Sequence, residues 1–465
     1  MKYISTRGRA TQLEFDEVLL AGLADDGGLY VPSHWPQFSF KELSSMAESS
    51  YAEVAYRVIR PFTHGTIDDD ILQSIIIETY ASFDHDSVAP LIKIGPNEWL
   101  LELFHGPTFA FKDFALQVIG RMFDHVLSVN QKRVTIVGAT SGDTGSAAIE
   151  ACRDRSTLDV FILFPEGKIS GVQRRQMTTV ASKNVHAMAI EGTFDDCQDL
   201  VKGMFNDKEF RAANSLSAVN SINWARVMVQ IVYYFYAGLR LGAPQQKVSF
   251  SVPTGNFGNV LAGWAAWKCG LPVDRIVVGT NSNDIMYRFF KTGQMKIEGV
   301  TSTLSPSMDI QVSSNFERFL FHVLGNDGAK VDNWVTRFRE TGTASVSDLS
   351  LFTTQEKFCA ARLNDNDTKR VIKDFFAATG EFLDPHSAIG LGAARQHRGD
   401  TSIPMVSLAT AHPAKFPDAV EASTGVRPNP PDRLADLFLK EEKFVRLPNN
   451  IGAIKTFIQQ TLKGQ

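Results

Sequence analysis

Apolar and polar positions along the chain follow two different periods. In residues 15–24, "FDEVLLAGLA", and 39–59, "SFKELSSMAESSYAEVAYRVI", apolar side chains recur at helical spacing on either side of the turn "DDGGLYVP". Later apolar runs are short, rich in β-branched or aromatic residues, and bounded by glycine, proline or polar turns, which is typical of strands. Six such runs occur at residues 134–139, 158–164, 184–190, 247–253, 274–280 and 404–410.

This alternation of strands with helices predicts an α/β fold in which parallel sheets are flanked by helices. We expect a mostly helical N-terminal region at 1–90, an α/β domain at 91–245, and a large α/β domain with the C-terminal region at 246–465. The 465 residues are enough for two or three domains with full cores. The more polar segment Val331–Asp367 predicts an insertion or a helical excursion.

The composition is that of an ordinary soluble protein, with 44% hydrophobic residues, 21% charged residues and a net charge of −4. This balance does not favour binding to nucleic acid or to an acidic membrane surface. No apolar run reaches the roughly 18 residues that cross a bilayer, and the N-terminal sequence lacks the apolar stretch of a signal peptide. We therefore expect a cytoplasmic protein.

The cysteine and histidine residues give no indication of a metal centre or of a disulfide framework. The four cysteines lie far apart and form no CxxC pair, which favours reduced, mostly buried thiols. The ten histidines are scattered and form no HExxH motif. We therefore expect no bound metal.

One lysine stands in an unusual setting. Lys112 lies between phenylalanines in "HGPTFAFKDFALQ" (residues 105–117). A lysine in such a run often extends its charged end to water while its stem is buried. Alternatively, burial lowers the pKa of the ammonium group and makes the amine a nucleophile that forms Schiff bases. The residues of this motif alone leave both interpretations open.

Two glycine-rich loops each follow a predicted strand and precede a predicted helix. They are "TSGDTG" at 140–145 and "TGNFGN" at 254–259. A strand, a glycine-rich loop and a helix in this order direct backbone N–H groups and the helix dipole at one point, which favours anions, especially phosphate. Neither loop matches a P-loop or a dinucleotide fingerprint. A purely structural role for Gly142, Gly255 and Gly258 in tight turns is the alternative.

Four motifs, in chain order, together resemble one family. The stretches "HGPTFAFKDFALQ", "GATSGDTGSAA", "PTGNFGN" and "LATAHPAKF" resemble the threonine synthases, which are pyridoxal phosphate (PLP) enzymes of fold type II, similar to the tryptophan synthase β subunit. The stretches "MKYISTRG" and "DDGGLYVP" are similar to the N-terminal region of that family. The resemblance runs from residue 1 to beyond Lys415.

The resemblance implies a role in PLP binding for several residues. Lys112 would hold PLP as a Schiff base, and Thr410 would face the pyridine nitrogen with a neutral hydroxyl. Lys415, in a loop among prolines, is the competing lysine, and Asp113 fits a helix N-terminus better than a catalytic acid. The cofactor phosphate would lie on the backbone amides of Gly255, Asn256, Phe257, Gly258 and Asn259.

The resemblance also implies two substrate-binding groups. The substrate α-carboxylate would be held by Thr140, Ser141 and Thr144. Asp143 stands where the wider fold type usually has an asparagine that contacts the phenolic oxygen of the cofactor, and its role stays open. The substrate phosphate would be held by Lys168, Asn220, Ser221 and Arg226. A solvated basic surface with a helix N-cap at Asn220 or Ser221 is the alternative.

The activity that the resemblance implies is a PLP-dependent γ-elimination followed by β-addition of water. It would convert O-phospho-L-homoserine to L-threonine and phosphate, the reaction of a carbon–oxygen lyase acting on phosphates in threonine biosynthesis. One alternative is a phosphohomoserine phospholyase or a serine/threonine dehydratase. Another is a catalytically silent protein that binds phosphorylated ligands. We expect a monomer or a small homo-oligomer.

Overall fold

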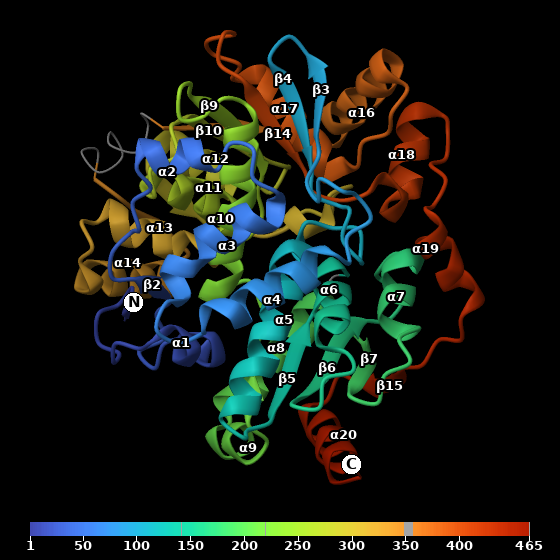
Figure 1. The fold of residues 1–465 in the computed structure, drawn as a ribbon. Helices are drawn as coiled ribbons and strands as arrows, with labels where there is room; N and C mark the ends of the chain where they lie inside the picture. Colours follow the sequence, from blue (N-terminus) through green and yellow to red (C-terminus); the bar gives the residue numbers. More distant parts are fainter. Residues whose placement is uncertain (141, 219, 348–356, 465) are drawn as a thin grey trace. The chain divides into compact units, whose positions relative to one another are not determined.

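The structure is a computed structural model that describes residues 1–140, 142–218, 220–347 and 357–464. The chain divides into two compact units (Figure 1). The larger unit comprises Met1–Ala115 and Ser221–Pro428, and the smaller unit comprises Leu116–Asn220 and Asn429–Gln465. None of the helices in the described residues is long and apolar enough to cross a membrane.

The N-terminal part of the larger unit is mostly helical, as predicted. Two capping boxes, at Ser39 with Glu42 and at Ser50 with Glu53, begin its second and third helices. A short antiparallel pair of strands, which the sequence did not suggest, joins residues on either side of the first helix. The elements are β1 (Tyr3–Ser5), α1 (Phe15–Ala21), β2 (Tyr30–Pro32), α2 (Phe40–Ser45), α3 (Tyr51–Thr63) and α4 (Asp69–Tyr80).

A six-stranded sheet forms the core of the larger unit, in the order β13-β10-β9-β14-β4-β3. All neighbours in this sheet are parallel except the β3–β4 pair. Phe250 contacts Tyr234 of α10, whereas the next residue, Ser251, donates to the carbonyl oxygen of Gly390 in α17, so these helices cover opposite faces. The strands are β3 (Leu91–Gly95), β4 (Glu98–Glu102), β9 (Val248–Pro253), β10 (Val273–Thr280), β13 (Phe358–Arg362) and β14 (Met405–Ala409).

In the larger unit, helices follow the strands β9, β10 and β13 of this sheet. The helical elements are α10 (Trp224–Arg240), α11 (Gly258–Lys268), α12 (Ile285–Thr292), η1 (Pro306–Met308), α13 (Phe316–Val323), α14 (Gly328–Thr341), α16 (Asp365–Thr379), α17 (Pro385–Gln396), η2 (Pro413–Lys415) and α18 (Pro417–Thr424). A further antiparallel pair consists of β11 (Gln294–Lys296) and β12 (Thr343–Ser345).

The segment Val331–Asp367 is only partly the helical excursion that its polarity predicted. Its start is helical because it contains most of α14, while residues 348–356 lie outside the described residues. The interpretation is wrong for Phe358–Arg362, which forms β13 and pairs in parallel with β10. The apolar side chains of Phe358, Ala360 and Ala361 are buried there, so a strand of the sheet lies inside a polar stretch of sequence.

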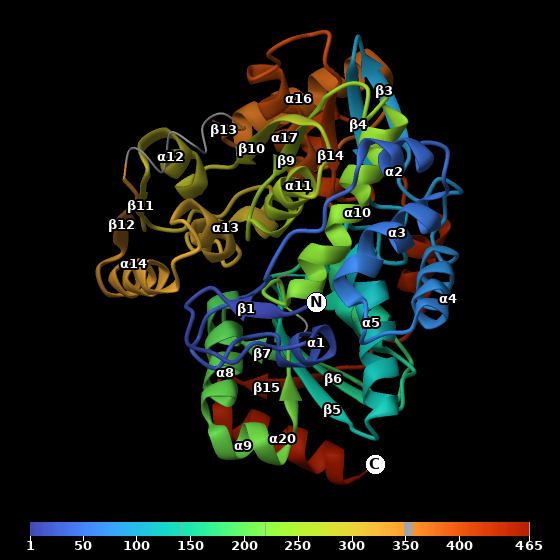
Figure 2. The same cartoon turned by 60° about the vertical axis from the view of Figure 1, so that its left-hand side comes forward.

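The smaller unit contains a five-stranded, entirely parallel sheet in the order β15-β7-β6-β5-β8. Side chains of α8 and α20 join its apolar core on one face, and Figure 2 shows α5 on the other face. Its strands are β5 (Val134–Ala139), β6 (Leu158–Pro165), β7 (Val185–Glu191), β8 (Leu216–Ser217) and β15 (Val445–Pro448). Its helical elements are α5 (Lys112–Val129, whose first turn belongs to the larger unit), α6 (Asp143–Cys152), α7 (Gly171–Thr178), α8 (Phe194–Asn206), α9 (Lys208–Ala213), α19 (Asp432–Ala435), η3 (Asp436–Leu439) and α20 (Ile451–Lys463).

The predicted fold class is confirmed, because two sheets flanked by helices, one entirely and one mainly parallel, follow a mostly helical N-terminal region. All six predicted strands are present, as β5, β6, β7, β9, β10 and β14. The division into domains at residues 90 and 245 stays a prediction.

Candidate active site

Lys112 is the first residue of α5 and lies at the end of a short pairing between two distant motifs. The backbone N–H of Phe111 donates to the carbonyl oxygen of Thr410 (2.9 Å), and that of His412 donates to the carbonyl oxygen of Phe109 (3.0 Å). Ala110 and Ala411 form an antiparallel bridge between these contacts. The lysine motif and the "LATAHPAKF" motif are therefore held side by side in the larger unit.

The turn before Lys112 is closed by Asp113. Its carboxylate accepts hydrogen bonds from the N–H and the hydroxyl of Thr108, both at 2.8 Å. The side chain is fully buried and lies in the first turn of α5, where a negative charge also complements the helix dipole. The Lys112 side chain is only 8% exposed, and its nitrogen lies 5.0 Å from the centre of the Phe111 ring. The charged end of Lys112 is thus mostly withdrawn from water.

Thr410 follows β14 and is fixed by a buried polar chain. Its N–H donates to the hydroxyl of Ser387 (2.8 Å), and that hydroxyl donates to the carboxylate of Asp384. Asp384 also caps α17 by accepting from the N–H groups of His386 and Ser387. Because β14 and β9 are parallel neighbours, Thr410 and the loop after β9 lie at the same edge of the sheet.

The loop after β9 has the close backbone approach that a phosphate cradle requires. Phe257 adopts a left-handed conformation (φ 62°) just before α11 begins at Gly258. A Cβ atom at Gly255 would lie 2.6 Å from the carbonyl oxygen of Ser307, so only glycine fits there. The N-terminal end of α11 then supplies N–H groups and the positive end of its dipole.

Asn259 adds a buried donor to this loop. Its side-chain oxygen accepts hydrogen bonds from the hydroxyls of Tyr233 (2.7 Å) and Tyr234 (2.8 Å), which fixes the orientation of the amide. Within the described residues, the buried side-chain nitrogen has no hydrogen-bond partner. A donor left unpaired in this way costs free energy unless a ligand pairs with it, so the loop fits an anion such as the phosphate of PLP.

Arg226 presents a second set of unpaired donors in the larger unit. It lies in the first turn of α10, is only 4% exposed, and its Nε and Nη1 atoms have no hydrogen-bond partner among the described residues. Burial lowers the pKa of this guanidinium to about 10. A cation buried without an anionic partner is costly, which is typical of a site that binds an anionic ligand.

Ser221 and Gln230 flank this arginine. The carbonyl oxygen of Ser221 accepts from the side chain of Asn315 (2.8 Å), and its hydroxyl lies 3.2 Å from that of Ser314. Gln230 is one helical turn after Arg226, and its buried side-chain oxygen also has no partner within the described residues. Gln230 is not among the residues predicted from the sequence, although its i, i+4 spacing from Arg226 on one helix is a usable signal.

The loop after β5, in the smaller unit, is closed by Thr140. Its hydroxyl oxygen accepts from the N–H groups of Gly142 (2.9 Å) and Gly145 (2.8 Å), and Gly142 has a φ of 136°. Asp143 is buried, and its carboxylate accepts from the side-chain amide of Gln173 (3.0 Å). Thr144 follows in the first turn of α6 and is partly exposed. Ser141 lies outside the described residues.

The other two predicted residues of the smaller unit also follow strands of its sheet. Lys168 is exposed and follows β6, and Asn220 is exposed and follows β8. Both strands pair in parallel with β5, so Lys168, Asn220 and Thr140 lie at the carboxyl edge of one sheet. The described predicted residues therefore form one group in each unit: Lys112, Ser221, Arg226, Gly255–Asn259 and Thr410 in the larger, and Thr140, Asp143, Thr144, Lys168 and Asn220 in the smaller.

Comparison with known proteins agrees with this arrangement. Residues 87–410 match the model of the pyridoxal-phosphate dependent enzymes, residues 2–80 match the threonine synthase N terminus, and residues 387–458 match the threonine synthase C-terminal region. A threonine synthase of Pseudomonas aeruginosa is 52% identical over 461 residues, which cover 99% of this chain and 98% of the relative. The chain belongs to the threonine synthase family.

Solved structures of threonine synthases have the same fold. The PLP-bound threonine synthase of Brucella melitensis superposes with a TM-score of 0.97 at 51% identity, covering 99% of each chain. The yeast threonine synthase superposes with a TM-score of 0.94 at 38% identity, covering 100% of this chain and 99% of that one. The resemblance to this family of fold-type II PLP enzymes is thereby confirmed, while the role of each residue stays a prediction.

Proposed function

We propose that the protein is a threonine synthase, a carbon–oxygen lyase that uses PLP to convert O-phospho-L-homoserine and water into L-threonine and phosphate. The observation that carries the proposal is the buried guanidinium of Arg226, whose Nε and Nη1 atoms find no partner in the described part of the chain and suit a phosphate dianion. The relative that is 52% identical along almost the whole chain bears the name threonine synthase. Both observations favour this function over the alternatives.

The residues of the larger unit fit PLP. Lys112 would carry the cofactor on its side-chain nitrogen, the backbone amides of Gly255–Asn259 would bind its phosphate, and Thr410 would face its pyridine nitrogen. When bound, PLP supplies an electron sink that stabilises negative charge on the substrate carbon atoms. Thr410 offers a neutral hydroxyl, so it does not hold a proton on that nitrogen as a carboxylate would.

We assign the proton transfers to Lys112. With PLP and substrate bound, the side-chain nitrogen of Lys112 would remove the protons from Cα and then from Cβ, and would return protons to Cγ and, after water has added at Cβ, to Cα before it displaces the product. Its burial beside Phe111 keeps competing water away from this nitrogen. The first turn of α5, closed by Asp113 and Thr108, holds the backbone of Lys112 in place during these steps.

The anionic groups of the substrate would be bound by the remaining residues. Thr140 and Thr144 keep the carboxylate-binding role that the resemblance implies, with Asp143 oriented by Gln173. Arg226 and Ser221 would bind the γ-phosphate from the larger unit, and Lys168 and Asn220 keep the phosphate-binding role that the resemblance implies. Arg226 holds this group as negative charge builds on it, and it keeps the released phosphate in position to accept a proton from the water that adds at Cβ.

The test follows both products in water enriched in oxygen-18. The PLP-loaded protein should release threonine and phosphate from O-phospho-L-homoserine in equal amounts, with the label in the threonine hydroxyl and none in the phosphate. Phosphate with 2-oxobutyrate would instead identify a phospholyase, and labelled phosphate with homoserine would identify a hydrolase. Absence of any product would support a silent binding protein. The cytoplasmic location and the small assembly size stay predictions.

A further inference from the structure

The segment Ser313–Arg318 contacts the proposed cofactor-phosphate loop of the larger unit. The hydroxyl of Ser313 donates to the carbonyl oxygen of Gly255 (2.6 Å), and the backbone N–H of Asn315 donates to that of Asn256 (3.1 Å). The hydroxyl of Ser314 donates to the side-chain oxygen of Asn256 (3.3 Å). Three successive residues therefore fix the backbone and a side chain of this loop.

The same segment also contacts the residues that lead into α10 and Arg226. The side-chain nitrogen of Asn315 donates to the carbonyl oxygen of Ser221 (2.8 Å), and Ser314 and Ser221 lie within hydrogen-bond distance through their hydroxyls (3.2 Å). Asn315 is fully buried. The backbone of Asn315 thus contacts the Gly255–Asn259 loop, and its side chain contacts the Ser221 turn that leads into α10.

Arg318 fixes the orientation of the Asn315 amide. Its guanidinium donates to the side-chain oxygen of Asn315, to the carbonyl oxygen of Ile222 (2.6 Å) and to that of Tyr30 (2.8 Å). The side chain is fully buried, and burial lowers its pKa to about 9. Because the arginine occupies the oxygen of the Asn315 amide, the nitrogen of that amide points to Ser221.

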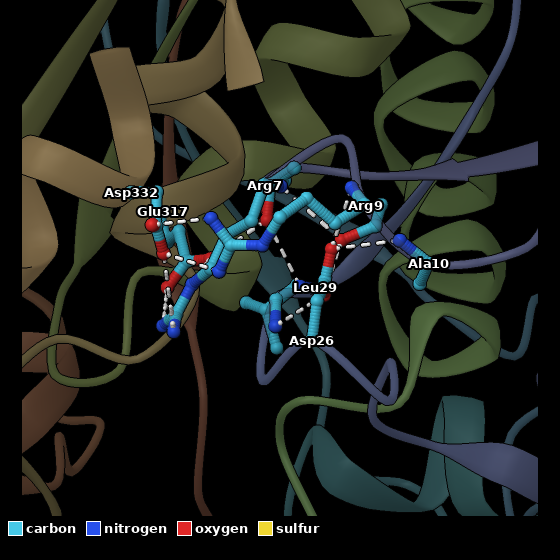
Figure 3. Close-up of polar contacts among 10 residues, drawn as sticks. Arg7, Arg9, Ala10, Asp26, Leu29, Glu317 and Asp332 are labelled. Carbon is cyan, nitrogen blue, oxygen red and sulfur yellow. Dashed lines mark hydrogen bonds and ion pairs between the residues drawn. The ribbon is translucent and has the colours of Figure 1, made fainter. Parts of the chain in front are cut away.

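Residues of the N-terminal region also contact this segment, through Glu317. Figure 3 shows the Arg7 guanidinium against the carboxylates of Glu317 and Asp332. Arg7 donates to both oxygens of Glu317 (3.1 and 3.0 Å), and the hydroxyl of Thr6 donates to the same carboxylate (2.7 Å). Through Glu317 and Arg318, the first β-strand pair of the chain is connected to both loops.

We propose that Asn315 is a positioning residue that sets the spacing between the Gly255–Asn259 loop and the Ser221 turn that begins α10. This inference rests on the proposed function, in which the first element fixes the cofactor and the second carries the clamp for the substrate phosphate. The spacing between them then selects the length of the carbon chain that joins the reacting atoms to the phosphate. Asn315 acts through the two loops and does not contact the substrate.

The variant Asn315→Asp tests this role with a minimal change of shape. Aspartate keeps an oxygen for Arg318, but it replaces the donor toward Ser221 with an oxygen that repels the carbonyl group. We expect the KM for O-phospho-L-homoserine to rise by about 10- to 100-fold, because one buried hydrogen bond is lost and an unfavourable contact replaces it. O-phospho-L-serine is one carbon shorter than this substrate. We also expect the ratio of kcat/KM for O-phospho-L-homoserine to kcat/KM for O-phospho-L-serine to fall by about tenfold.

Binding of inorganic phosphate distinguishes an effect on the spacing from an effect on the clamp, which consists of the phosphate-binding residues Arg226 and Ser221. Phosphate contacts only the clamp, so its dissociation constant on the PLP-loaded protein, measured by calorimetry, should change by less than about threefold in the variant. The matched control is Asn184→Asp in the smaller unit, where a buried amide donates to the carbonyl oxygens of Cys152, Arg155 and Leu158. This control should lower stability without changing the preference between the two phosphorylated amino acids.

The outcomes distinguish this inference from the proposed function. If the wild-type protein makes no threonine, the proposed function is wrong. If the wild-type protein makes threonine, either of two results would show that Asn315 does not set the spacing. In the first, Asn315→Asp keeps the preference between the two phosphorylated amino acids, as the control does. In the second, it weakens the binding of phosphate and of substrate equally. Ser314→Ala, which removes the hydroxyl between Ser221 and Asn256, gives a milder second test. It should raise the same KM by about fivefold and leave phosphate binding unchanged.

Discussion

The ammonium group of Lys415 donates a hydrogen bond to the backbone carbonyl oxygen of Thr108, with 2.7 Å between the two atoms. Lys415 is fully buried, and Thr108 belongs to the turn that Asp113 closes before α5. The second lysine among the family motifs therefore supports the turn that presents Lys112. This contact gives the two lysines different roles.

Borohydride reduction of the PLP-loaded protein should place the cofactor on Lys112 alone. Lys112→Ala should yield no reduced adduct, while Lys415→Met should keep the adduct on Lys112 because the methionine retains most of the apolar stem. Losing the donor to Thr108 should lower the free energy of unfolding by about 1 to 3 kcal/mol. Peptide mass spectrometry and urea denaturation measure the two effects. An adduct on Lys415 in the wild-type protein would contradict the assignment.

The Gly255 backbone should tolerate no side chain. In Gly255→Ala the new methyl group meets the carbonyl oxygen of Ser307, so the loop must move and PLP affinity should fall by at least about tenfold. The matched control is Gly171→Ala at the start of α7, where, apart from the neighbouring backbone, no atom of the described residues lies within 4 Å of the new methyl group. That change should stabilise the protein by about 0.4 to 1 kcal/mol. Equal PLP affinity in both variants, measured by fluorescence titration, would exclude a close phosphate cradle at Gly255.

The loops of the candidate site could be predicted from the sequence because their signals are local. A β-branched run, a glycine-rich turn and a helical period follow one another within about 20 residues around Gly142 and again around Gly255. The same local signals located the six predicted strands. The bridge between Ala110 and Ala411 could not be predicted from local signals, because 300 residues of sequence separate the two motifs that it joins.

Other parts of the structure depend on partners that the local sequence does not reveal. Arg318 stands among the phenylalanines of α13, where its charge predicts a solvent-exposed position, yet it is fully buried. Its acceptors belong to Tyr30, Ile222 and Asn315, and only the folded chain brings the first two to it. Likewise β15 is only four residues long and largely exposed, and it becomes a strand only by pairing with β7.

His322 should make stability depend on pH in the acidic range. Burial, with a smaller contribution from Lys268, lowers the pKa of this imidazole to about 4, below the value of about 6.5 expected in the unfolded chain. The unfolded state therefore binds the proton first, and stability falls as the pH drops from 6.5 towards 4, by at most about 1.4 kcal/mol per pH unit for this group. His322→Phe retains an aromatic ring against Trp264. It should remove the contribution of His322 to the change of the free energy of unfolding with pH. Identical slopes for the two proteins in urea denaturation between pH 4.5 and 6.5 would show that His322 is not the responsible group.

Arg226 should reduce the stability of the ligand-free protein while it supports catalysis. Arg226→Leu removes a charge-assisted contact to a dianion, which should cost about 2 to 4 kcal/mol of transition-state binding, or roughly 30- to 800-fold in kcat/KM. The same change removes a buried cation whose Nε and Nη1 atoms have no partner among the residues that the structure describes, so the free energy of unfolding should stay equal or rise. Arg240→Leu at the other end of α10 is the matched control. It loses contacts to the carbonyl oxygens of Ala47 and Ser49 and should lower stability while leaving kcat/KM unchanged.

The pH dependence of this trade-off follows from the lowered pKa of Arg226. Its guanidinium has a pKa of about 10 in the folded protein, below the ordinary pKa of an arginine, so the folded state releases the proton first as the pH rises. The cost of burying the charge is fully present below pH 10 and declines above it, since the unfolded state then binds more protons than the folded state. Any advantage in stability of Arg226→Leu should therefore be constant at neutral pH and shrink above pH 10.

A phosphate-free amino acid should bind equally well to the wild-type protein and to Arg226→Leu, because it never contacts the clamp. Equal losses for it and for O-phospho-L-homoserine, or lower stability of Arg226→Leu at neutral pH, would mean that Arg226 supports the fold instead of the substrate phosphate.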